Sequence, residues 1–325
     1  MIIIFSFPSD NVTNKIIEWL KFYKCDFKRI NLEEEDYKNI EIQFSDNKVN
    51  LFLRLKDGFI LNIDEVDYFL IRGAGFDFKF ESENKTVLPK VLFNHYIQKE
   101  YNSLVNLFYT EANKKSIGCF YTDHSFDKLT QLKLANEVGL KLAKSIITSK
   151  NNRIREYFNQ KKIITKAIYD NIAIDFENYL YVQRVQRISE ELNVENFFPS
   201  FLQEEIEKKY EIRSFYLEGD IYTIAIYSDC KQNVDSRDNY DNSIYTSYKL
   251  PDDIENKIRL LMNKLRLNSG SFDFIKSIDD EYFFIEINPT GQYDWVSVFG
   301  NYDLHNKIAK SLVNKLKYGG EKSSN

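Results

Sequence analysis

The chain has 325 residues, of which 43% are hydrophobic and 15% aromatic, so it holds enough apolar material for packed cores and is not globally disordered. Its formal charge of −5 lacks the basic excess that binding to a nucleic-acid backbone demands, which argues against nucleic acid as a partner. At this length we expect two or three subdomains that share an active-site cleft.

Residues 2–7 form the first expected strand. Their apolar run is too short to span a membrane and follows no basic segment, so neither an export signal nor a membrane partner is expected. The three cysteines lack any C-x-x-C spacing, which suits a reducing compartment and predicts a cytoplasmic protein. Because histidine is equally scarce, with three residues, an oxygen-bound hard cation is favoured over a transition metal.

The first third of the chain has the alternating pattern of an α/β unit, which we assign to an N-terminal subdomain of residues 1–114. Its expected elements are strands at 2–7 and 26–30, a helix at 11–24, short β segments over 40–72 and a long helix at 86–112.

A central subdomain of residues 115–202 and a C-terminal subdomain of residues 203–325 follow. The central part is expected to hold a strand near 117–120, a helix at 126–139 and a strand-helix-strand run to 168. The last part is strand-rich, with strands at 201–206, 211–217, 221–227, 271–277 and 281–287, helices at 252–266 and 302–317, and a disordered tail at 319–325. The aperiodic segment 229–247 is expected to be a loop or a hairpin, and it is long enough to suggest a function.

Two of the last strands carry candidate metal ligands. Glu286 and Asn288 point the same way because alternate residues of a strand share a face, and a hairpin-like return places Asp273 beside them. Two carboxylates and an amide match the oxygen ligands that Mg²⁺ takes when its other positions go to phosphate and water. The alternative is that these polar residues face only solvent.

Further motifs upstream occur in the order found in the ATP-grasp family. Residues 201–206 (FLQEEI) and 210–213 (YEIR) resemble its adenine hinge and ribose contact, and Lys166 lies on the strand that sends a lysine to the phosphates. The resemblance implies an α/β (α+β) ATP-grasp fold whose central and C-terminal subdomains sandwich ATP. It also implies roles for individual side chains: Lys166 at the nucleotide phosphates, Gln203, Glu204 and the backbone of Ile206 at adenine, Glu211 at the ribose, Arg213 at the transferring phosphoryl group, and Asp273, Glu286 and Asn288 at Mg²⁺.

A narrower resemblance points to the graspetide macrocyclases, the microviridin-type and grasp-with-spasm branch that modifies ribosomal peptides. It rests on residues 71–73 (IRG), 133–140 (KLANEVGL), 198–204 (FPSFLQE), 211–213 (EIR) and 286–293 (EINPTGQY). The implied reaction activates Asp or Glu side chains of a precursor peptide as acyl phosphates, which Ser, Thr or Lys side chains then attack to form ω-ester or ω-amide crosslinks. A precursor peptide with a leader and an acidic core is the implied partner, and a homodimer is a possible assembly.

The sequence departs from its relatives at three places. Residues 169–178 contain no glycine where many relatives have a glycine-rich phosphate lid. Ser271 stands where ligases for free amino acids often carry arginine, so Arg213 becomes the main cationic partner. Asp235-Ser236-Arg237 replaces an Asp-Trp-Arg motif that meets the leader peptide, and Asp235 and Arg237 keep its charged pair.

Arg72, at the end of a predicted strand, has two open interpretations: contact with substrate carboxylates, or a structural ion pair. Two other functions also remain open for the whole chain. One is a glutamate-ligase-like enzyme that adds an amino acid to a protein or peptide, and the other is a catalytically silent ATP-grasp fold that binds a peptide as an adaptor.

Overall fold

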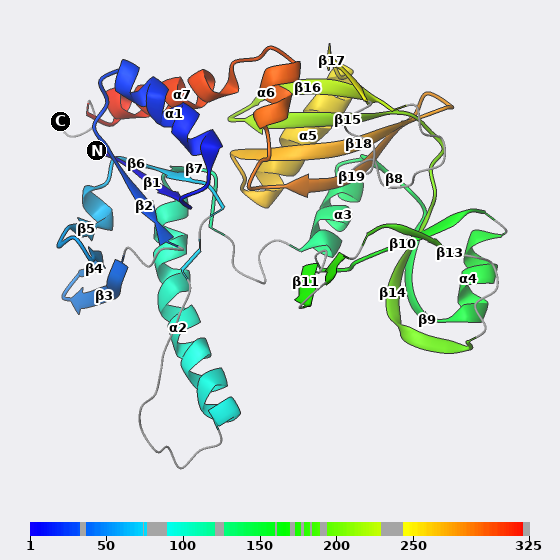
Figure 1. The fold of residues 1–325 in the computed structure, drawn as a ribbon, viewed down its shortest axis with the longest axis horizontal. Helices are drawn as coiled ribbons and strands as arrows, with labels where there is room; N and C mark the ends of the chain where they lie inside the picture. The colour runs from blue at the N-terminus through cyan, green and yellow to red at the C-terminus, as the bar shows by residue number, and fades with distance from the viewer. Residues whose placement is uncertain are drawn as a thin grey trace.

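The computed structural model describes residues 1–32, 37–73, 75–76, 90–120, 127–159, 161–169, 173–176, 179–182, 184–188, 194–228 and 243–320. The elements form three groups, each built around its own main sheet (Figure 1).

The N-terminal unit contains a four-stranded parallel sheet in the order β2-β1-β6-β7. Its strands are β1 (Ile2–Ser6), β2 (Phe27–Asn31), β6 (Tyr68–Ile71) and β7 (Ser116–Ile117). Such sheets are apolar on both faces, and the first four strand residues from Ile2 to Phe5 are all fully buried. Ile2 and Ile4 pack with α1 (Asn11–Phe22) and α7 (Leu304–Gly320), while Ile3 and Phe5 pack on the other side.

The other side of this sheet is covered by a long helix and a small antiparallel sheet. These elements are α2 (Lys90–Asn113), β3 (Tyr37–Ser45), β4 (Lys48–Leu55), β5 (Ile60–Asn62) and the 3-10 turn η2 (Ile63–Glu65). Val105, Phe108 and Ala112 bury the C-terminal half of α2 in this core. The N-terminal half projects away from the unit (Figure 1), and its Leu92 and Tyr96 are more than half exposed.

The central unit is a four-stranded antiparallel sheet in the order β13-β10-β14-β9. Its strands are β9 (Ser145–Lys150), β10 (Ile163–Lys166), β13 (Gln186–Ile188) and β14 (Asn196–Glu204). The helix α4 (Asn151–Phe158) packs Ile154 and Phe158 against Leu202 of β14. A two-stranded hairpin of β11 (Ala173–Phe176) and β12 (Tyr179–Val182) follows β10, where the sequence lacks the glycine-rich lid.

The C-terminal unit holds a six-stranded sheet in the order β17-β16-β15-β18-β19-β8. Its strands are β8 (Lys141–Leu142), β15 (Lys208–Leu217), β16 (Asp220–Tyr227), β17 (Ile244–Tyr248), β18 (Ser269–Ser277) and β19 (Tyr282–Asn288). The helices α3 (Lys128–Glu137) and α5 (Asp252–Leu265) pack against Phe272 and Phe284 on one face. The short helix α6 (Asp294–Phe299) packs Val296 with Phe215 and Ile224 on the other.

Packing links the ends of the chain. α7 leaves the C-terminal unit and returns to α1, where the Tyr23 hydroxyl donates to Asn306 Oδ1 at 2.6 Å. The helix continues through Gly319 and Gly320, where the sequence predicts a disordered tail. Extending a helix that is already docked costs little. The predicted subdomain boundaries at 114/115 and 202/203 stay predictions. In the structure, β7 and α7 lie after residue 114 in the chain, yet both contribute to the N-terminal unit.

Within the described part of the chain, no helix is both long enough and apolar enough to cross a membrane.

Candidate active site

Three charged residues form a row across neighbouring strands of the six-stranded sheet. Arg213 of β15 stands opposite Asp273 of β18, and Asp273 stands opposite Glu286 of β19. Directly opposed residues of an antiparallel ladder point to the same face. Asn288 and Glu211 lie two residues from members of the row along their own strands, so they share this face as well. The hairpin return expected from the sequence therefore exists.

Arg213 is held firmly in this row. Its guanidinium Nη1 donates to Asp273 Oδ2 at 2.5 Å, and Nη2 donates to the carbonyl oxygen of Gln292 at 3.3 Å. The guanidinium carbon lies 5.6 Å from the ring centre of Trp295. Only 7% of Arg213 is exposed, so its charge acts where water screens it little.

Lys128, at the start of α3, is a cation in the site that the sequence reasoning did not identify. Its Nζ lies 3.7 Å from Glu286 Oε2 and donates to the carbonyl oxygen of Ala167 at 3.2 Å. Ala167 follows Lys166 directly, so Lys128 stands between β19 and the end of β10. In the sequence, only the helix start beside Lys128 could be predicted, because Asp127 is a typical N-cap residue. In the structure Asp127 caps α3 by accepting from Thr130 N at 2.9 Å.

The side chains present fit a hard cation. Among the described residues, no cluster of three or more His, Cys, Asp and Glu side chains is arranged to hold a metal. A third protein oxygen beside Asp273 and Glu286 would have to come from the Asn288 amide, as the sequence predicts. Its Oδ1 accepts from Thr290 N at 3.1 Å and from Thr290 Oγ1 at 2.6 Å. Because a hydroxyl rotates freely, Oγ1 can give up its bond and leave a lone pair for the cation, while the N–H keeps Oδ1 in place.

The proposed adenine residues lie where the chain passes from the four-stranded sheet to the six-stranded sheet. Gln203 is 4% exposed and donates from Nε2 to Ser145 Oγ at 3.0 Å. Glu204 pairs with Lys161, and its backbone N–H donates to the carbonyl oxygen of Lys144 at 2.8 Å. Ile206, half-buried, lies in the short connection between β14 and β15. A base bound here would contact both sheets.

Glu211 continues this line toward the charged row. Its Oε1 accepts from Lys208 Nζ at 2.6 Å, and Arg213 follows on the same face about 7 Å further along the strand. The order of hinge, Glu211 and Arg213 matches the order of base, ribose and phosphates in a nucleotide. Lys166 ends β10, opposite Phe201 of β14.

Arg72 follows β6 and is 12% exposed. Its Nη1 donates to the carbonyl oxygens of Thr290 at 2.5 Å and Gly291 at 2.9 Å, and its Nε lies 3.5 Å from Asp10 Oδ2. These contacts join the N-terminal unit to the segment after β19, which is the kind of contact that the structural interpretation of this residue predicts. Asp235 and Arg237, expected to meet the leader peptide, lie outside the described residues.

No protein-family model and no curated protein matches the sequence, but solved structures resemble the fold closely. A RiPP-associated ATP-grasp ligase from Chryseobacterium gregarium, in complex with ADP and a leader and core peptide, is 24% identical, with a TM-score of 0.75 over 97% of this chain and 96% of that one. The macrocyclase MdnC from Microcystis aeruginosa MRC, bound with its precursor peptide MdnA, is 22% identical, with a TM-score of 0.74 over 96% and 99%.

A third structure is the ATP-grasp ligase PsnB, complexed with a minimal precursor, Mg and ADP, which is 13% identical with a TM-score of 0.71 over 97% of this chain and 98% of that one. Similarity over nearly the whole of each chain shows that this protein has the ATP-grasp fold, as the resemblance of its motifs predicts.

Proposed function

We propose that this protein is a cytoplasmic, ATP- and Mg²⁺-dependent ligase that crosslinks the side chains of a ribosomal precursor peptide. The observation that carries the proposal is the row of Arg213, Asp273 and Glu286 on one face of the six-stranded sheet, in a fold that resembles ligases solved with ADP and precursor peptides. Transfer of a phosphoryl group needs positioning and charge neutralisation more than covalent chemistry by the protein. A cationic arginine beside two carboxylates that can hold a cation suits both needs.

ATP supplies the γ-phosphoryl group that turns a peptide carboxylate into an acyl donor, and Mg²⁺ draws negative charge away from the phosphate oxygens. The carboxylate oxygen takes the phosphoryl group and ADP departs. A Ser or Thr hydroxyl or a Lys amine then attacks the acyl carbon, and phosphate leaves. Each crosslink therefore removes one water from the peptide.

The chain's own residues divide this work by position. Asp273, Glu286 and the Asn288 amide hold the cation, and Gln203, Glu204, the Ile206 backbone and Glu211 hold the nucleoside. Lys166 and Lys128 neutralise phosphate charge from the side of β10 and α3. Arg213 faces the transferring group and stabilises the charge that builds on it. Asp235 and Arg237 remain the candidates for contact with the leader.

The test incubates the purified protein with ATP, Mg²⁺ and a precursor peptide rich in Thr, Ser, Lys, Asp and Glu, and follows the peptide by mass spectrometry. The expected product is lighter by one water per crosslink. Asp273→Asn and Glu286→Gln should abolish it. Asp279→Asn is the matched control, because Asp279 is an exposed carboxylate in the turn of the same hairpin.

Three results would reject the proposal. Full turnover by Asp273→Asn or Glu286→Gln would remove the charged row from the mechanism. Addition of a free amino acid to the peptide would favour the glutamate-ligase-like alternative. Peptide binding without any ATP consumption would favour an adaptor.

A further inference from the structure

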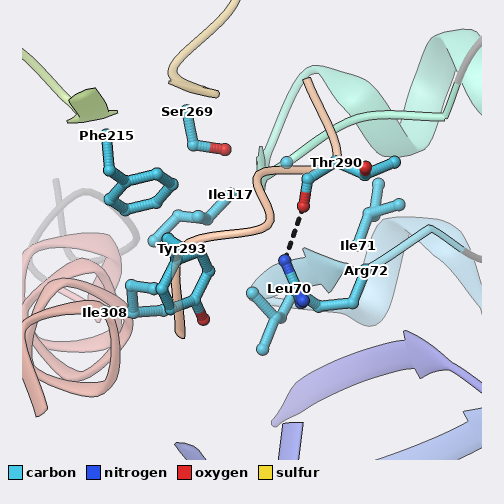
Figure 2. A pocket seen from close by; sticks show the side chains of 10 residues that line it. Leu70, Ile71, Arg72, Ile117, Phe215, Ser269, Thr290, Tyr293 and Ile308 are labelled. Atoms are coloured by element: carbon cyan, nitrogen blue, oxygen red, sulfur yellow. Dashed lines mark hydrogen bonds between the residues drawn. The ribbon is translucent and has the colours of Figure 1, made fainter. Parts of the chain in front are cut away.

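The segment that leaves β19, Pro289 to Tyr293, runs between two arginines from different units. Arg72 of the N-terminal unit binds two consecutive carbonyl oxygens of this segment, those of Thr290 and Gly291. Figure 2 shows the hydrogen bond to Thr290. Arg213 binds the next carbonyl, that of Gln292. Three successive peptide groups are therefore fixed by guanidinium donors, which form a rigid planar fork.

Arg72 also contacts Asp10 and the ring of Tyr293. Its Nε lies 3.5 Å from Asp10 Oδ2, and its guanidinium carbon lies 5.0 Å from the ring centre of Tyr293. Asp10 is 4% exposed and also caps α1, where its Oδ1 accepts from Val12 N at 3.1 Å and from Thr13 N at 3.3 Å. The arginine thus connects the start of α1 in the N-terminal unit to the end of β19 in the C-terminal unit.

The cavity described beside Arg72 is too small for a peptide carboxylate. The cavity beside it is lined by Arg72, Thr290, Tyr293, Phe215 and Ser269 with their neighbours (Figure 2), and its volume is about 10 Å³. That volume accommodates about one water molecule. A carboxylate side chain does not fit there, and two donors of the guanidinium are already committed to backbone oxygens.

Thr290 connects Arg72 to the Asn288 amide, which is a candidate metal ligand. The residue whose carbonyl oxygen binds Arg72 also donates its own N–H to Asn288 Oδ1 at 3.1 Å. Gly291, next in the chain, has a φ of +59°, and a Cβ there would lie 2.9 Å from Phe215 Cε2, so the segment has little freedom to adopt another course. A change at Arg72 should therefore move the Asn288 amide.

We propose that Arg72 is a positioning residue, which acts from the N-terminal unit through Thr290 to hold the Asn288 amide oxygen in place for the cation. The inference rests on the proposed function, because it takes Asn288 as a metal ligand. It assigns Arg72 no contact with the peptide. Losing a partner that orients a metal ligand commonly lowers metal affinity about 10- to 100-fold.

The experiment uses the full chain with Trp19→Phe, which leaves Trp295 as the only tryptophan. The Trp295 indole donates to the Gln292 carbonyl at 3.1 Å, so its emission reports on the segment without any turnover. A separate assay measures Mn²⁺ binding as the loss of the paramagnetic resonance signal of free Mn²⁺, in the presence of a non-hydrolysable ATP analogue. The peptide KM is measured at saturating Mg²⁺.

Arg72→Leu should shift Trp295 emission and weaken Mn²⁺ binding about tenfold or more, with the peptide KM unchanged. Arg72→Lys should show an intermediate loss, since lysine keeps the charge but not the fork, and this variant serves if Arg72→Leu does not fold. Arg29→Leu is the matched control: Arg29 lies on β2 of the same sheet and donates to the Phe7 carbonyl at 2.5 Å, so its loss should leave Mn²⁺ binding unchanged.

Normal Mn²⁺ binding by Arg72→Leu, or an increase confined to the peptide KM, would overturn the inference. Asp273→Asn distinguishes a wrong positioning role from a wrong metal site. If Asp273→Asn abolishes Mn²⁺ binding while Arg72→Leu does not, the metal site is supported and the positioning role of Arg72 is rejected. If neither change matters, the proposed metal site itself is wrong.

Discussion

At the scale of single residues, Lys128 shows how one side chain joins parts of the site that are far apart in sequence. Its Nζ contacts both Glu286 and the Ala167 carbonyl. Under the proposed function, a cation there would neutralise the phosphates of a bound nucleotide beside Asp273 and Glu286. Charged hydrogen bonds of this kind contribute about 1.5–3 kcal/mol.

We therefore expect Lys128→Met to raise the KM for ATP about 10- to 100-fold without loss of the folded state. Steady-state kinetics with varied ATP and fixed peptide would measure the effect, with circular dichroism as the check on folding. Lys133→Met is the matched control, because Lys133 is an exposed lysine on the same helix. An unchanged KM for ATP in Lys128→Met would place the nucleotide phosphates elsewhere.

At the scale of elements, the connection between β14 and β15 matters most, because it joins the two sheets that flank the proposed nucleotide position. Glu205 in this connection accepts from Arg187 of β13 through both carboxylate oxygens, at 2.7 and 2.8 Å. Its backbone N–H donates to the Lys162 carbonyl at 2.9 Å. The connection is thus tied to the four-stranded sheet by side chain and backbone.

The Arg187 hydrogen bonds lower the pKa of Glu205 below its ordinary value of 4.5. A carboxyl group whose pKa falls on folding binds fewer protons in the folded state, so its stabilising effect is full above pH 4.5 and is lost as pH falls through the folded-state pKa. Glu205→Gln should accordingly lower the Tm at pH 7, and the gap to the unaltered protein should narrow below pH 4.5. Thermal denaturation across this range tests the sign; a gap that widens on acidification would contradict it.

At the scale of the whole molecule, one hydrophobic core joins the two ends of the chain. Ile2 and Ile4 of β1, Leu20 of α1 and Leu312 of α7 belong to the same buried cluster as Phe215 of β15. The N-terminal unit and the six-stranded sheet therefore share buried surface, and we expect them to unfold together.

Leu312→Ala should cost about 2–5 kcal/mol, because Leu312 is fully buried and the change leaves a cavity. Hydrogen exchange should then accelerate in α1 and β1 as well as in α7, since all three pack in this core. Val298→Ala is a suitable control, because that residue of α6 is 60% exposed. Faster exchange limited to α7 would mean that the helix is only an attachment to the N-terminal unit.

Local patterns in the sequence were sufficient for most of the longer elements and for the charged hairpin, but they did not predict β11, β12, β13, β17 or α6. Strand alternation and a short return predict that Asp273 stands beside Glu286, and the register of β18 and β19 confirms this. The motifs around Gln203 and Glu211 predict the ATP-grasp fold, which the structural comparisons confirm. Such features depend on residues close together in the chain, where periodicity and turn chemistry decide the outcome.

Only the tertiary structure decided which distant residues meet. Lys128 reaches Glu286 because α3 packs on the six-stranded sheet, and nothing in the spacing of those residues requires it. Arg72 and Thr290 are 218 residues apart, and the sequence leaves Arg72 open between a substrate contact and a structural one. Contacts of this kind follow from the burial of shared apolar surface between units, which the sum of many side chains determines and no local pattern encodes.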